Sequence, residues 1–353
     1  MPPGSSWPRL PSHSLPKRLP MKAIIPLAGK GTRLRPHTLT TPKPLVHVGG
    51  RPVMSYILDE LLELGIDEMV FVVGYLQDVA RDYIAREYPQ IRAHFVVQEV
   101  QDGTAGAIKL AEPWVDDDVL ILFVDTLFEA DLSVTGALDP QWAGVIWAKE
   151  VEDYQRFGVI VTDEDGAMTR IVEKPSEPIS RLANIGLYYI RDTTLLFEGI
   201  NHVLASEKGA SGEYYLTDAF QYMVDRGGRI RTAPVAGWYD CGKVDALLET
   251  NAWLVGGGRA LVSDEARISG SEVDEPVRIE AGVRVKDSRI GPNVTLEAGA
   301  RVENSTLRDC IVGAGAHLRD CRIHDSIVGP QSELLGARGI VNAGPHTRMV
   351  VDD

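Results

Sequence analysis

Residues 27–45 read LAGKGTRLRPHTLTTPKPL and follow directly on a short apolar run at residues 23–27. Two glycines open the stretch and three cations follow them: Gly29, Gly31, Arg33, Arg35 and Lys43. Glycine lets backbone N–H groups come close to phosphate oxygens. Arginine and lysine offset the charge of a polyphosphate. The stretch therefore predicts a loop that binds a polyphosphate at the end of a strand.

Two common phosphate-loop patterns do not fit this stretch. A Walker A loop needs lysine after its last glycine, but Gly31 is followed by Thr32. A dinucleotide fingerprint needs a third glycine where Leu34 stands. Prolines 36, 42 and 44 predict an extended path that carries Lys43 back toward the loop. An ordinary surface turn is the alternative reading of the glycines alone.

The whole stretch resembles the signature of the sugar nucleotidylyltransferases, GxGTRLxPxTxxxPKPLxxVxxxP. The matching positions are Gly29, Gly31, Thr32, Arg33, Leu34, Pro36, Thr38, Pro42, Lys43, Pro44, Leu45, Val48 and Pro52. This resemblance implies transfer of a nucleoside monophosphate onto a sugar 1-phosphate with loss of pyrophosphate. The type it resembles most is glucose-1-phosphate thymidylyltransferase, in which the arginine and lysine matched here by Arg33 and Lys43 are catalytic.

Composition limits the partners of the chain. At 353 residues it is long enough for two domains, and its net charge of −14 argues against nucleic acid as a partner. Three cysteines, Cys241, Cys310 and Cys321, favour a reduced, cytoplasmic protein. Cys310 and Cys321 are expected to be buried thiols rather than a disulfide.

Targeting segments are not expected. No apolar run reaches the length of a membrane span, so a membrane is not expected as a partner. Residues 1–20 contain six prolines and no acidic residue, and they lack the apolar core of a secretory signal. We expect them to be a disordered extension upstream of Met21.

Strand-like and helical patterns alternate over residues 21–255, the predicted nucleotidyltransferase domain. Residues 69–73, 94–97 and 119–123 are expected to be buried strands, and a helix from Val53 should end at Gly65. This alternation predicts an α/β fold, a Rossmann-like and mostly parallel sheet. Ligands of such sheets bind beyond the carboxyl ends of the strands, where the Gly29 loop is expected.

A different pattern occupies residues 259–353, after a predicted linker at 256–258. Residues 307–322 align with residues 323–338 at a period of sixteen, which places Cys310 on Ser326 and Ile311 on Ile327. Apolar residues recur five or six apart: Ile290, Leu296, Val302, Leu307, Val312, Leu318, Ile323, Val328 and Leu334. Three such steps make a triangular coil, which predicts a left-handed parallel β-helix. An antiparallel sandwich is the alternative. Stacked coils also suggest a homo-oligomer formed through the β-helix.

Two aspartates follow strand-like runs, Asp125 after residues 119–124 and Asp240 after residues 230–235. Phosphoryl-type transfer uses Mg²⁺, which takes one or two carboxylates. The two sites resemble the family motifs GDxxF and WxDxG, which implies that Asp125 and Asp240 are metal ligands for a Mg²⁺ cofactor. Val124 replaces the usual glycine of the first motif. Without the resemblance, Asp125 would be a capping residue.

Further motifs extend the resemblance into the substrate sites. The residues it assigns to nucleotide binding are Leu27, Gly29, Gly31, Thr32, Gln98, Gly103 and Thr104. The residues it assigns to the sugar phosphate are Gly158, Glu173, Lys174 and Asn184, from motifs resembling FGV, EKP and NxGxY. Residues 213–218 match GEYxLTD, where we expect Asp218 to be structural.

The predicted reaction is Mg²⁺-dependent transfer from a nucleoside triphosphate, dTTP or UTP, to glucose 1-phosphate. GTP with mannose 1-phosphate remains an alternative, because related transferases share the loop. A second alternative is acyl transfer in the β-helix by His317, His324 or His346. A non-catalytic homologue is disfavoured, because Arg33, Lys43 and Asp125 are all present.

Overall fold

The computed structural model describes residues 21–209 and 212–351, so the predicted extension 1–20 lies outside the described residues. The chain folds into two compact units, and each is described by itself. One unit contains residues 57–238 together with the first strand of the chain, and the other contains residues 30–56 and the chain from Tyr239 onward. The linear boundary between residues 255 and 259 stays a prediction.

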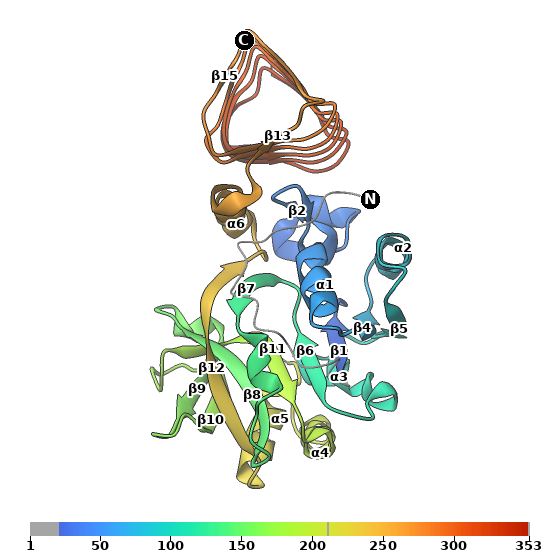
Figure 1. Cartoon of the computed structure of the whole chain (residues 1–353), viewed down its shortest axis with the longest axis vertical. Helices are drawn as coiled ribbons and strands as arrows, with labels where there is room; N and C mark the ends of the chain where they lie inside the picture. Colours follow the sequence, from blue (N-terminus) through green and yellow to red (C-terminus); the bar gives the residue numbers. More distant parts are fainter. Residues whose placement is uncertain (1–20, 210–211, 352–353) are drawn as a thin grey trace. The chain divides into compact units, whose positions relative to one another are not determined.

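The first unit is built on a large mixed sheet (Figure 1). Its strands lie in the order β5 (Arg92–Val97), β4 (Glu68–Val73), β1 (Lys22–Pro26), β6 (Val119–Leu122), β11 (Leu182–Ile190), β8 (Trp142–Glu150), β12 (Arg229–Asp240) and β7 (Thr126–Ala130). Two further strands, β9 (Gly158–Thr162) and β10 (Met168–Glu173), pair beside β11. The β5–β4–β1–β6 part is parallel throughout, and β11 runs antiparallel to both of its neighbours, β6 and β8. The predicted Rossmann-like, mostly parallel sheet is thus confirmed, with an antiparallel strand inserted at β11.

Helices cover this sheet because its strands are apolar on both faces. The α-helices of the described residues are α1 (Val53–Glu63), α2 (Gln77–Glu87), α3 (Thr104–Lys109), α4 (Thr193–Leu204), α5 (Leu216–Asp225) and α6 (Val244–Leu254), and α6 belongs to the second unit. Side chains of α3, α4 and α5 form one core with Ile24, Val70 and Ile121. The intervening residues Ala23 and Ile25 are fully buried too, so the opposite face of β1 is also covered.

The strands predicted at residues 69–73, 94–97 and 119–123 are confirmed as β4, β5 and β6. The predicted helix from Val53 is α1, and Gly65 follows it in the left-handed region at φ 79°. The strand predicted at residues 230–235 is longer than expected, because β12 continues through Trp238 to Asp240. Asp240 is therefore the last residue of a strand rather than part of the loop after it.

The signature segment does not follow the extended path that its prolines predicted. It forms three short 3-10 turns, Thr32–Leu34, His37–Leu39 and Lys43–Leu45, and then a small hairpin of β2 (His47–Val48) and β3 (Arg51–Pro52). Proline supports the third turn, because Pro44 occupies an early turn position where no backbone N–H is needed. Lys43 nevertheless returns to the glycine loop as predicted, and its Cβ lies 2.9 Å from where a Cβ on Gly31 would be.

The C-terminal part of the second unit is a parallel β-helix, seen along its axis as stacked triangular coils (Figure 1). The coils contain β13 (Leu261–Val262), β14 (Arg267–Ser269), β15 (Glu272–Val273), β16 (Val277–Ile279), β17 (Arg284–Lys286), β18 (Arg289–Ile290), β19 (Val294–Leu296), β20 (Arg301–Glu303), β21 (Thr306–Val312), β22 (His317–Arg319), β23 (Arg322–Val328), β24 (Glu333–Leu335), β25 (Arg338–Gly339), β26 (Asn342–Ala343) and β27 (Arg348–Val350). The predicted register is confirmed, since Cys310 pairs with Ser326 and Ile311 with Ile327. All nine periodic apolar residues predicted to point inward are buried. The sandwich alternative is excluded because these strands pair in parallel.

The linker predicted at residues 256–258 lies in a wide helical turn, Val255–Arg259, that joins α6 to β13. Gly257 and Gly258 leave the helical conformation there, which lets the chain turn into the first coil. Cys241, Cys310 and Cys321 are buried thiols, as expected for Cys310 and Cys321.

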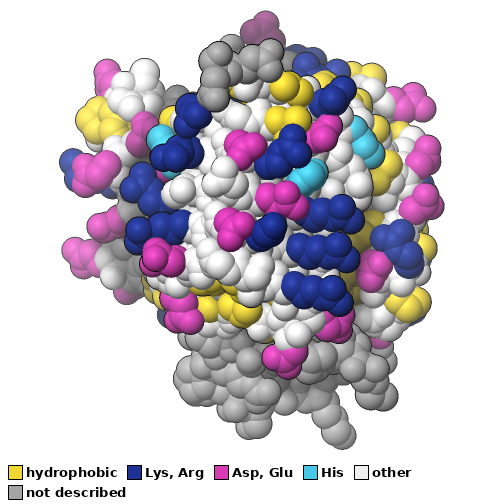
Figure 2. Space-filling view, turned by 90° about the horizontal axis from the view of Figure 1, so that it is seen from above, with side chains coloured by type: hydrophobic (Ala, Val, Ile, Leu, Met, Phe, Trp, Pro, Cys, Tyr) yellow, Lys and Arg dark blue, Asp and Glu magenta, His cyan; other side chains and the backbone are white. Residues whose placement is uncertain are grey.

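The surface carries both signs of charge in close proximity (Figure 2). Three outward arginines occupy matching positions on neighbouring strands of the β-helix, Arg267, Arg284 and Arg301. The net negative charge of the chain therefore coexists with locally positive columns. In the part of the chain that the structure describes, no helix is both long and apolar enough to cross a bilayer.

Candidate active site

The end of β5 is followed by the loop that the sequence assigned to the nucleobase. Gln98 is 7% exposed, and its amide nitrogen donates to Oδ1 of Asp102 at 3.1 Å and to the carbonyl of Gly103 at 3.2 Å. These two bonds fix the side chain of Gln98 against its own loop. Because both amide hydrogens are used in these bonds, the amide oxygen of Gln98 is left to accept a hydrogen bond from the edge of a base.

Gly103 is required by its surroundings. Its φ is 123°, and an added Cβ would lie 2.3 Å from the carbonyl oxygen of Tyr214. Backbone bonds join the same two segments, from Tyr214 N–H to Asp102 at 2.7 Å and from Ala105 N–H to Tyr214 at 3.0 Å. The hydroxyl of Thr104 accepts the N–H of Leu216 at 2.9 Å. The segment of residues 212–218, which matches the GEYxLTD motif, thus holds the loop in place. Motif spacing in the sequence did not indicate this contact.

Other predicted nucleotide-loop residues in this unit lie at the end of β1. Leu27 is buried, and its N–H donates to the carbonyl of Val72 at 2.7 Å, so it continues the sheet. The carbonyl of Ala28 accepts a bond from Gln101 at 2.7 Å. Gly29 is exposed, and a Cβ added to it would meet nothing within 4 Å. Packing therefore does not require glycine at residue 29, which leaves approach of a ligand as the physical reason for it.

The residues predicted to bind the sugar come together around Gly158. A Cβ at Gly158 would lie 2.3 Å from Nδ2 of Asn184 and 2.9 Å from Oε2 of Glu173. The amide of Asn184 donates to the carbonyl of Gly158 at 2.9 Å, and its oxygen accepts the hydroxyl of Tyr188. Three separate motifs of the sequence thus form one polar cluster on β9, β10 and β11.

Burial raises the pKa of Glu173, while the nearby Lys174 charge and a hydrogen bond from Thr217 lower it in part. Lys174 Nζ lies 3.8 Å from Oε1 of Glu173 and 5.3 Å from the centre of the Tyr215 ring. Lys174 itself has a φ of 47°, an uncommon conformation for a side-chain-bearing residue. Such strain is typical of sites where the direction of a side chain matters. Burial also raises the pKa of Asp218.

Asp125 lies between β6 and β7 and is partly buried. Its charge, together with that of Glu173, adds to burial in raising the pKa of Tyr188. The neighbouring Thr126 hydroxyl is buried and has no hydrogen-bond partner within the described chain. The charge of Asp125 thus acts on Tyr188, a member of the sugar cluster.

The second unit brings Arg33, Lys43 and Asp240 together. A Cβ added to Gly242 would lie 2.8 Å from Oδ1 of Asp240, 3.1 Å from Nη2 of Arg33 and 3.4 Å from Nζ of Lys43. Oδ1 of Asp240 also accepts the N–H of Gly242 at 2.6 Å. Two cations and one carboxylate from segments far apart in the sequence thus converge on a residue without a side chain. This arrangement can bind a polyphosphate and a divalent cation together.

The glycine turn that precedes Arg33 is held by its own segment. Gly31 has a φ of 60°, and its carbonyl accepts the hydroxyl of Thr38 at 2.7 Å. Thr32 and Arg33 are exposed on the turn that follows, whereas Leu34 is buried beneath it. The cationic side chain is therefore presented to solvent on a turn that is fixed by a buried neighbour.

A metal ion would have to share its ligands with substrate. Among residues 21–209 and 212–351, no group of three or more His, Cys, Asp or Glu side chains could hold a metal by itself. Mg²⁺ fits such a sparse donor set, because it keeps water and takes phosphate oxygens in addition to one or two carboxylates. Asp125 in the first unit and Asp240 in the second are each carboxylates, the hard oxygen donors that Mg²⁺ prefers.

Two residues of these clusters were not predicted as site residues. Gly242 belongs to the WYDCG motif, and its need for glycine is visible only from the side chains that surround it. Tyr188 belongs to the NIGLY motif, and its hydroxyl orients Asn184. The motifs contain both residues, but motif spacing does not show which members contact one another.

The histidines considered for acyl transfer lie on separate parts of the β-helix. His317 is on β22 and His324 on β23, strands of two different sheets, and His346 follows β26. His324 pairs with its neighbour Asp325 at 2.8 Å. The described chain thus does not bring the three histidines into one site.

Comparisons with known proteins agree with this geometry. A family model described as nucleotidyl transferase matches residues 22–255. The chain is 32% identical over 222 residues to UTP–glucose-1-phosphate uridylyltransferase AglF of Haloferax volcanii, which covers 62% of this chain and 89% of that protein. It is 30% identical over 287 residues to glucose-1-phosphate thymidylyltransferase of Streptomyces antibioticus, covering 75% of this chain and 79% of that protein.

The β-helix also has a counterpart in a curated relative. The bifunctional protein GlmU of Methanococcus vannielii is 31% identical over 341 residues, covering 94% of this chain and 77% of that protein. Among solved structures, UDP-glucose pyrophosphorylase in complex with UDP-glucose matches with a TM-score of 0.58 and 26% identity, covering 65% of this chain and 97% of that one. The chain belongs to the nucleotidyl transferase family and carries a C-terminal β-helix.

Proposed function

We propose that the protein transfers a nucleoside monophosphate from a nucleoside triphosphate to glucose 1-phosphate and releases pyrophosphate. The observation that carries this proposal is the meeting of Arg33, Lys43 and Asp240 around Gly242. The family of the chain, and the names of its relatives, support sugar-phosphate nucleotidyl transfer as the reaction class.

The acceptor needs no general base. A phosphate monoester has its second pKa near 6, so the sugar 1-phosphate oxygen is already ionised at neutral pH. It attacks the α-phosphorus in line, the α–β bridging bond breaks, and pyrophosphate leaves. Catalysis then consists of positioning and charge stabilisation, which is what fixed cations provide.

Arg33 and Lys43 neutralise the departing pyrophosphate in this proposal. Asp125 and Asp240 would hold Mg²⁺, which supplies further positive charge to the phosphate oxygens. Lys174 binds the acceptor phosphate, and its cationic Nζ stands beside the sugar cluster. Glu173 and Asn184 hydrogen-bond the sugar hydroxyls, and Gly158 lets both side chains pack against its backbone.

UTP or dTTP is our proposed donor, with the amide of Gln98 and the turn at Gly103 and Thr104 facing the base. The backbone of the Leu27–Gly29–Gly31–Thr32 loop lies along the phosphates. Two of the relatives are named for UTP with glucose 1-phosphate or for thymidylyl transfer to it. The remaining amide oxygen of Gln98 can accept from the ring N–H of either uracil or thymine.

A panel assay tests the donor and the acceptor together. Pyrophosphate release is measured with UTP, dTTP, GTP, CTP and ATP, each combined with glucose, N-acetylglucosamine or mannose 1-phosphate. We expect the highest kcat/KM with a uracil or thymine nucleotide and glucose 1-phosphate. Preference for GTP with mannose 1-phosphate would replace the proposed specificity, and the absence of release with every pair would contradict the reaction itself.

Acyl transfer in the β-helix is a second candidate because several relatives are named bifunctional. Incubation with labelled acetyl-CoA and glucosamine 1-phosphate, followed by chromatography, tests it directly. The separation of His317, His324 and His346 over different strands leads us to expect no labelled product. We further propose that the protein works in the cytoplasm, as its three free cysteines suggest, and that it forms a homo-oligomer through the β-helix.

A further inference from the structure

The outer face of the β-helix carries one continuous column of residues that point away from its core. In register along neighbouring strands, the column consists of Arg278, Thr295, Ile311, Ile327 and Asn342. Ile311 and Ile327 are only 3% and 4% exposed although they point outward, because α6 packs on this face. Asn342 at one end of the column contacts the signature segment, and Arg278 at the other end lies beside Gly50 of the hairpin.

At one end, Asn342 binds the segment directly after Arg33. Its amide oxygen lies 2.6 Å from Nε2 of His37, and its amide nitrogen donates to the carbonyl of Arg35 at 3.3 Å. His37 is 5% exposed, and burial lowers its pKa. A Cβ added to Gly344 would lie 3.0 Å from Pro36, so the backbones of the two segments approach closely here.

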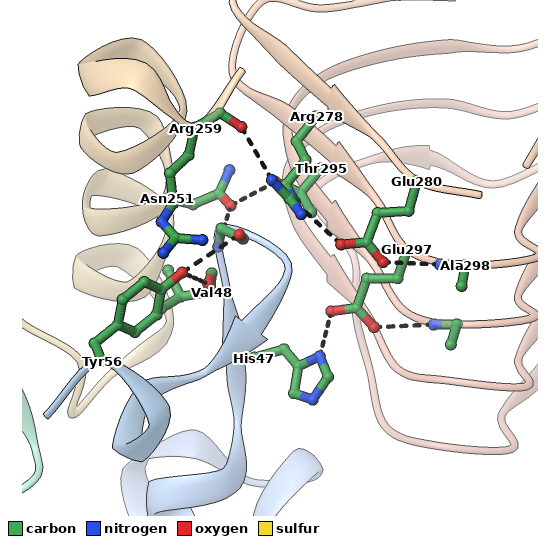
Figure 3. Close-up of polar contacts among 12 residues, drawn as sticks. His47, Val48, Tyr56, Asn251, Arg259, Arg278, Glu280, Thr295, Glu297 and Ala298 are labelled. Carbon is green, nitrogen blue, oxygen red and sulfur yellow. Dashed lines mark hydrogen bonds and ion pairs between the residues drawn. The ribbon is translucent and has the colours of Figure 1, made fainter. Parts of the chain in front are cut away.

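Near the other end of the column, Asn251 of α6 binds both the column member Thr295 and the hairpin that follows Lys43 (Figure 3). Its side chain is fully buried, and its oxygen accepts the N–H of Gly49 at 3.0 Å and the hydroxyl of Thr295 at 2.7 Å. Its nitrogen donates to the carbonyl of Asn293 at 3.1 Å. The amide of Asn251, which is carried by α6, thus joins the hairpin to the coil through three hydrogen bonds.

Neighbouring contacts make the hairpin end rigid (Figure 3). Gly49 has a φ of 56°, and a Cβ there would lie 2.9 Å from Leu254 and 3.0 Å from the Tyr56 hydroxyl. That hydroxyl donates to the carbonyl of Val48 at 2.8 Å. Nδ1 of His47 lies 2.8 Å from Oε1 of Glu297 on the coil. The hairpin therefore has little freedom to shift relative to the coil face.

We infer that Asn342 and Asn251 are positioning residues for nucleotidyl transfer, because they fix the two ends of the segment that presents Arg33 and Lys43. This inference rests on the proposed function. Both asparagines act through backbone groups of the signature segment and do not touch the reacting atoms. Reactions that depend on positioning lose rate when a cationic group moves by about 1 Å. The β-helix is in this sense a template for the phosphate loop.

Asn342→Ala is the principal test, because residue 342 is exposed and its loss leaves the coil core intact. We expect kcat to fall about tenfold or more while KM for each substrate changes less than about threefold. Asn342→Asp keeps an acceptor for His37 but has no donor for the carbonyl of Arg35. Its kcat should lie between those of wild type and Asn342→Ala. Thr306→Ala, an exposed position of β21 outside the column, is the matched control and should behave as wild type.

Hydrogen exchange of residues 31–46 gives a readout that is independent of turnover. We expect faster exchange there in Asn342→Ala and in Asn251→Ala than in wild type, with unchanged exchange in the coils around β19 to β22. Wild-type kcat together with wild-type exchange in Asn342→Ala would overturn the inference. A lower kcat that only follows a smaller folded fraction, measured by thermal unfolding, would overturn it as well.

The same measurements separate this inference from the proposed function. If wild type releases no pyrophosphate with any substrate pair, the proposed function fails, and exchange of residues 31–46 alone decides whether the asparagines hold the loop. If wild type is active and Asn342→Ala is equally active with unchanged exchange, the function stands and the positioning role fails.

Discussion

Nη2 of Arg33 and Oδ1 of Asp240 both lie against Gly242. A Cβ added to this glycine would be 3.1 Å from the first atom and 2.8 Å from the second. Arg33 belongs to the signature segment and Asp240 ends β12, so these two groups are about two hundred residues apart in the sequence. Glycine at residue 242 lets these two opposite charges approach the same stretch of backbone, where even a Cβ would be crowded.

A side chain at residue 242 should impair turnover, because it would displace these charged groups. Gly242→Ala places a methyl group against Arg33, Lys43 and Asp240, and we expect kcat to fall by roughly ten- to a hundredfold with little change in melting temperature. Gly257→Ala is the matched control, since a Cβ there meets nothing within 4 Å. Steady-state kinetics and thermal unfolding of both variants test this prediction. Normal turnover in Gly242→Ala would show that catalysis does not need glycine at residue 242.

Arg33 should contribute to the transition state rather than to folding. Arg33→Ala is expected to lower kcat by roughly 10²–10³-fold, the usual loss for one preorganised electrostatic group. Its side chain is exposed, so unfolding should be little affected. Arg301→Ala, which removes an exposed arginine from the β-helix, is the control for charge alone. Near-normal turnover of Arg33→Ala in a pyrophosphate-release assay would rule out this role.

Removal of divalent cations should abolish activity without unfolding the protein. The described residues contain no cluster of three metal-binding side chains, so no metal is expected to stabilise the fold. Excess EDTA should therefore leave the melting temperature unchanged and stop pyrophosphate release, and added Mg²⁺ should restore it. Asp125→Asn and Asp240→Asn should each raise the Mg²⁺ concentration needed for half-maximal rate. Full activity in EDTA would contradict a metal-dependent reaction.

Glu173 should limit stability at neutral pH. Burial raises its pKa above the usual 4.5, so the ionised form is disfavoured in the folded protein. The contribution of Glu173 to stability is thus greatest below pH 4.5 and is lost as the pH rises through the folded pKa. Glu173→Gln keeps the size of the side chain and removes the charge, so it should melt higher than wild type at pH 7.

The stability gain from Glu173→Gln should shrink as the pH falls toward 4.5, where wild-type Glu173 is protonated as well. Thermal unfolding between pH 4 and pH 8 measures this difference, with Glu177→Gln as a control at a more exposed site. We expect the same variant to raise KM for the sugar 1-phosphate. A pH-independent difference in melting temperature would contradict a raised pKa for Glu173.

The His47–Glu297 pair should make the hairpin pH-sensitive. Burial opposes the charge on His47, but Glu297, and to a smaller extent Glu280, raise its pKa overall. Its stabilisation is therefore present below about pH 6.5 and is lost as the pH rises through the folded pKa. Since the His47 side chain is 43% exposed, the effect should stay within about 1 kcal/mol.

Glu297→Gln tests that pair by thermal unfolding at pH 5.5 and pH 8.5. The variant should lose stability relative to wild type at the lower pH and match it more closely at the higher pH. High salt should reduce the difference at pH 5.5, because the partly exposed pair is screened. An equal loss at both pH values would indicate that the hydrogen bond, and not the charge, stabilises the hairpin.

Much of the fold could be predicted because it is encoded locally. Apolar runs of strand length gave β4, β5 and β6, and the repeat of sixteen gave the register in which Cys310 lies beside Ser326. A period in the sequence becomes a register in space when each coil stacks on the preceding one. The path of residues 32–45 was predicted less well, because three prolines restrict φ in turns as well as in extended chain.

The sequence by itself determined the family motifs, the alternation of strands and helices, and the repeat of the β-helix, because these depend on residues close together in the chain. Only the tertiary structure decided which distant groups meet. Asn342 bonds to the carbonyl of Arg35 across 307 residues of sequence, and no local pattern indicates that contact. Such pairings follow from how the coil face, α6 and the signature segment pack together. The residues that hold the phosphate loop in place are therefore visible only in the folded chain.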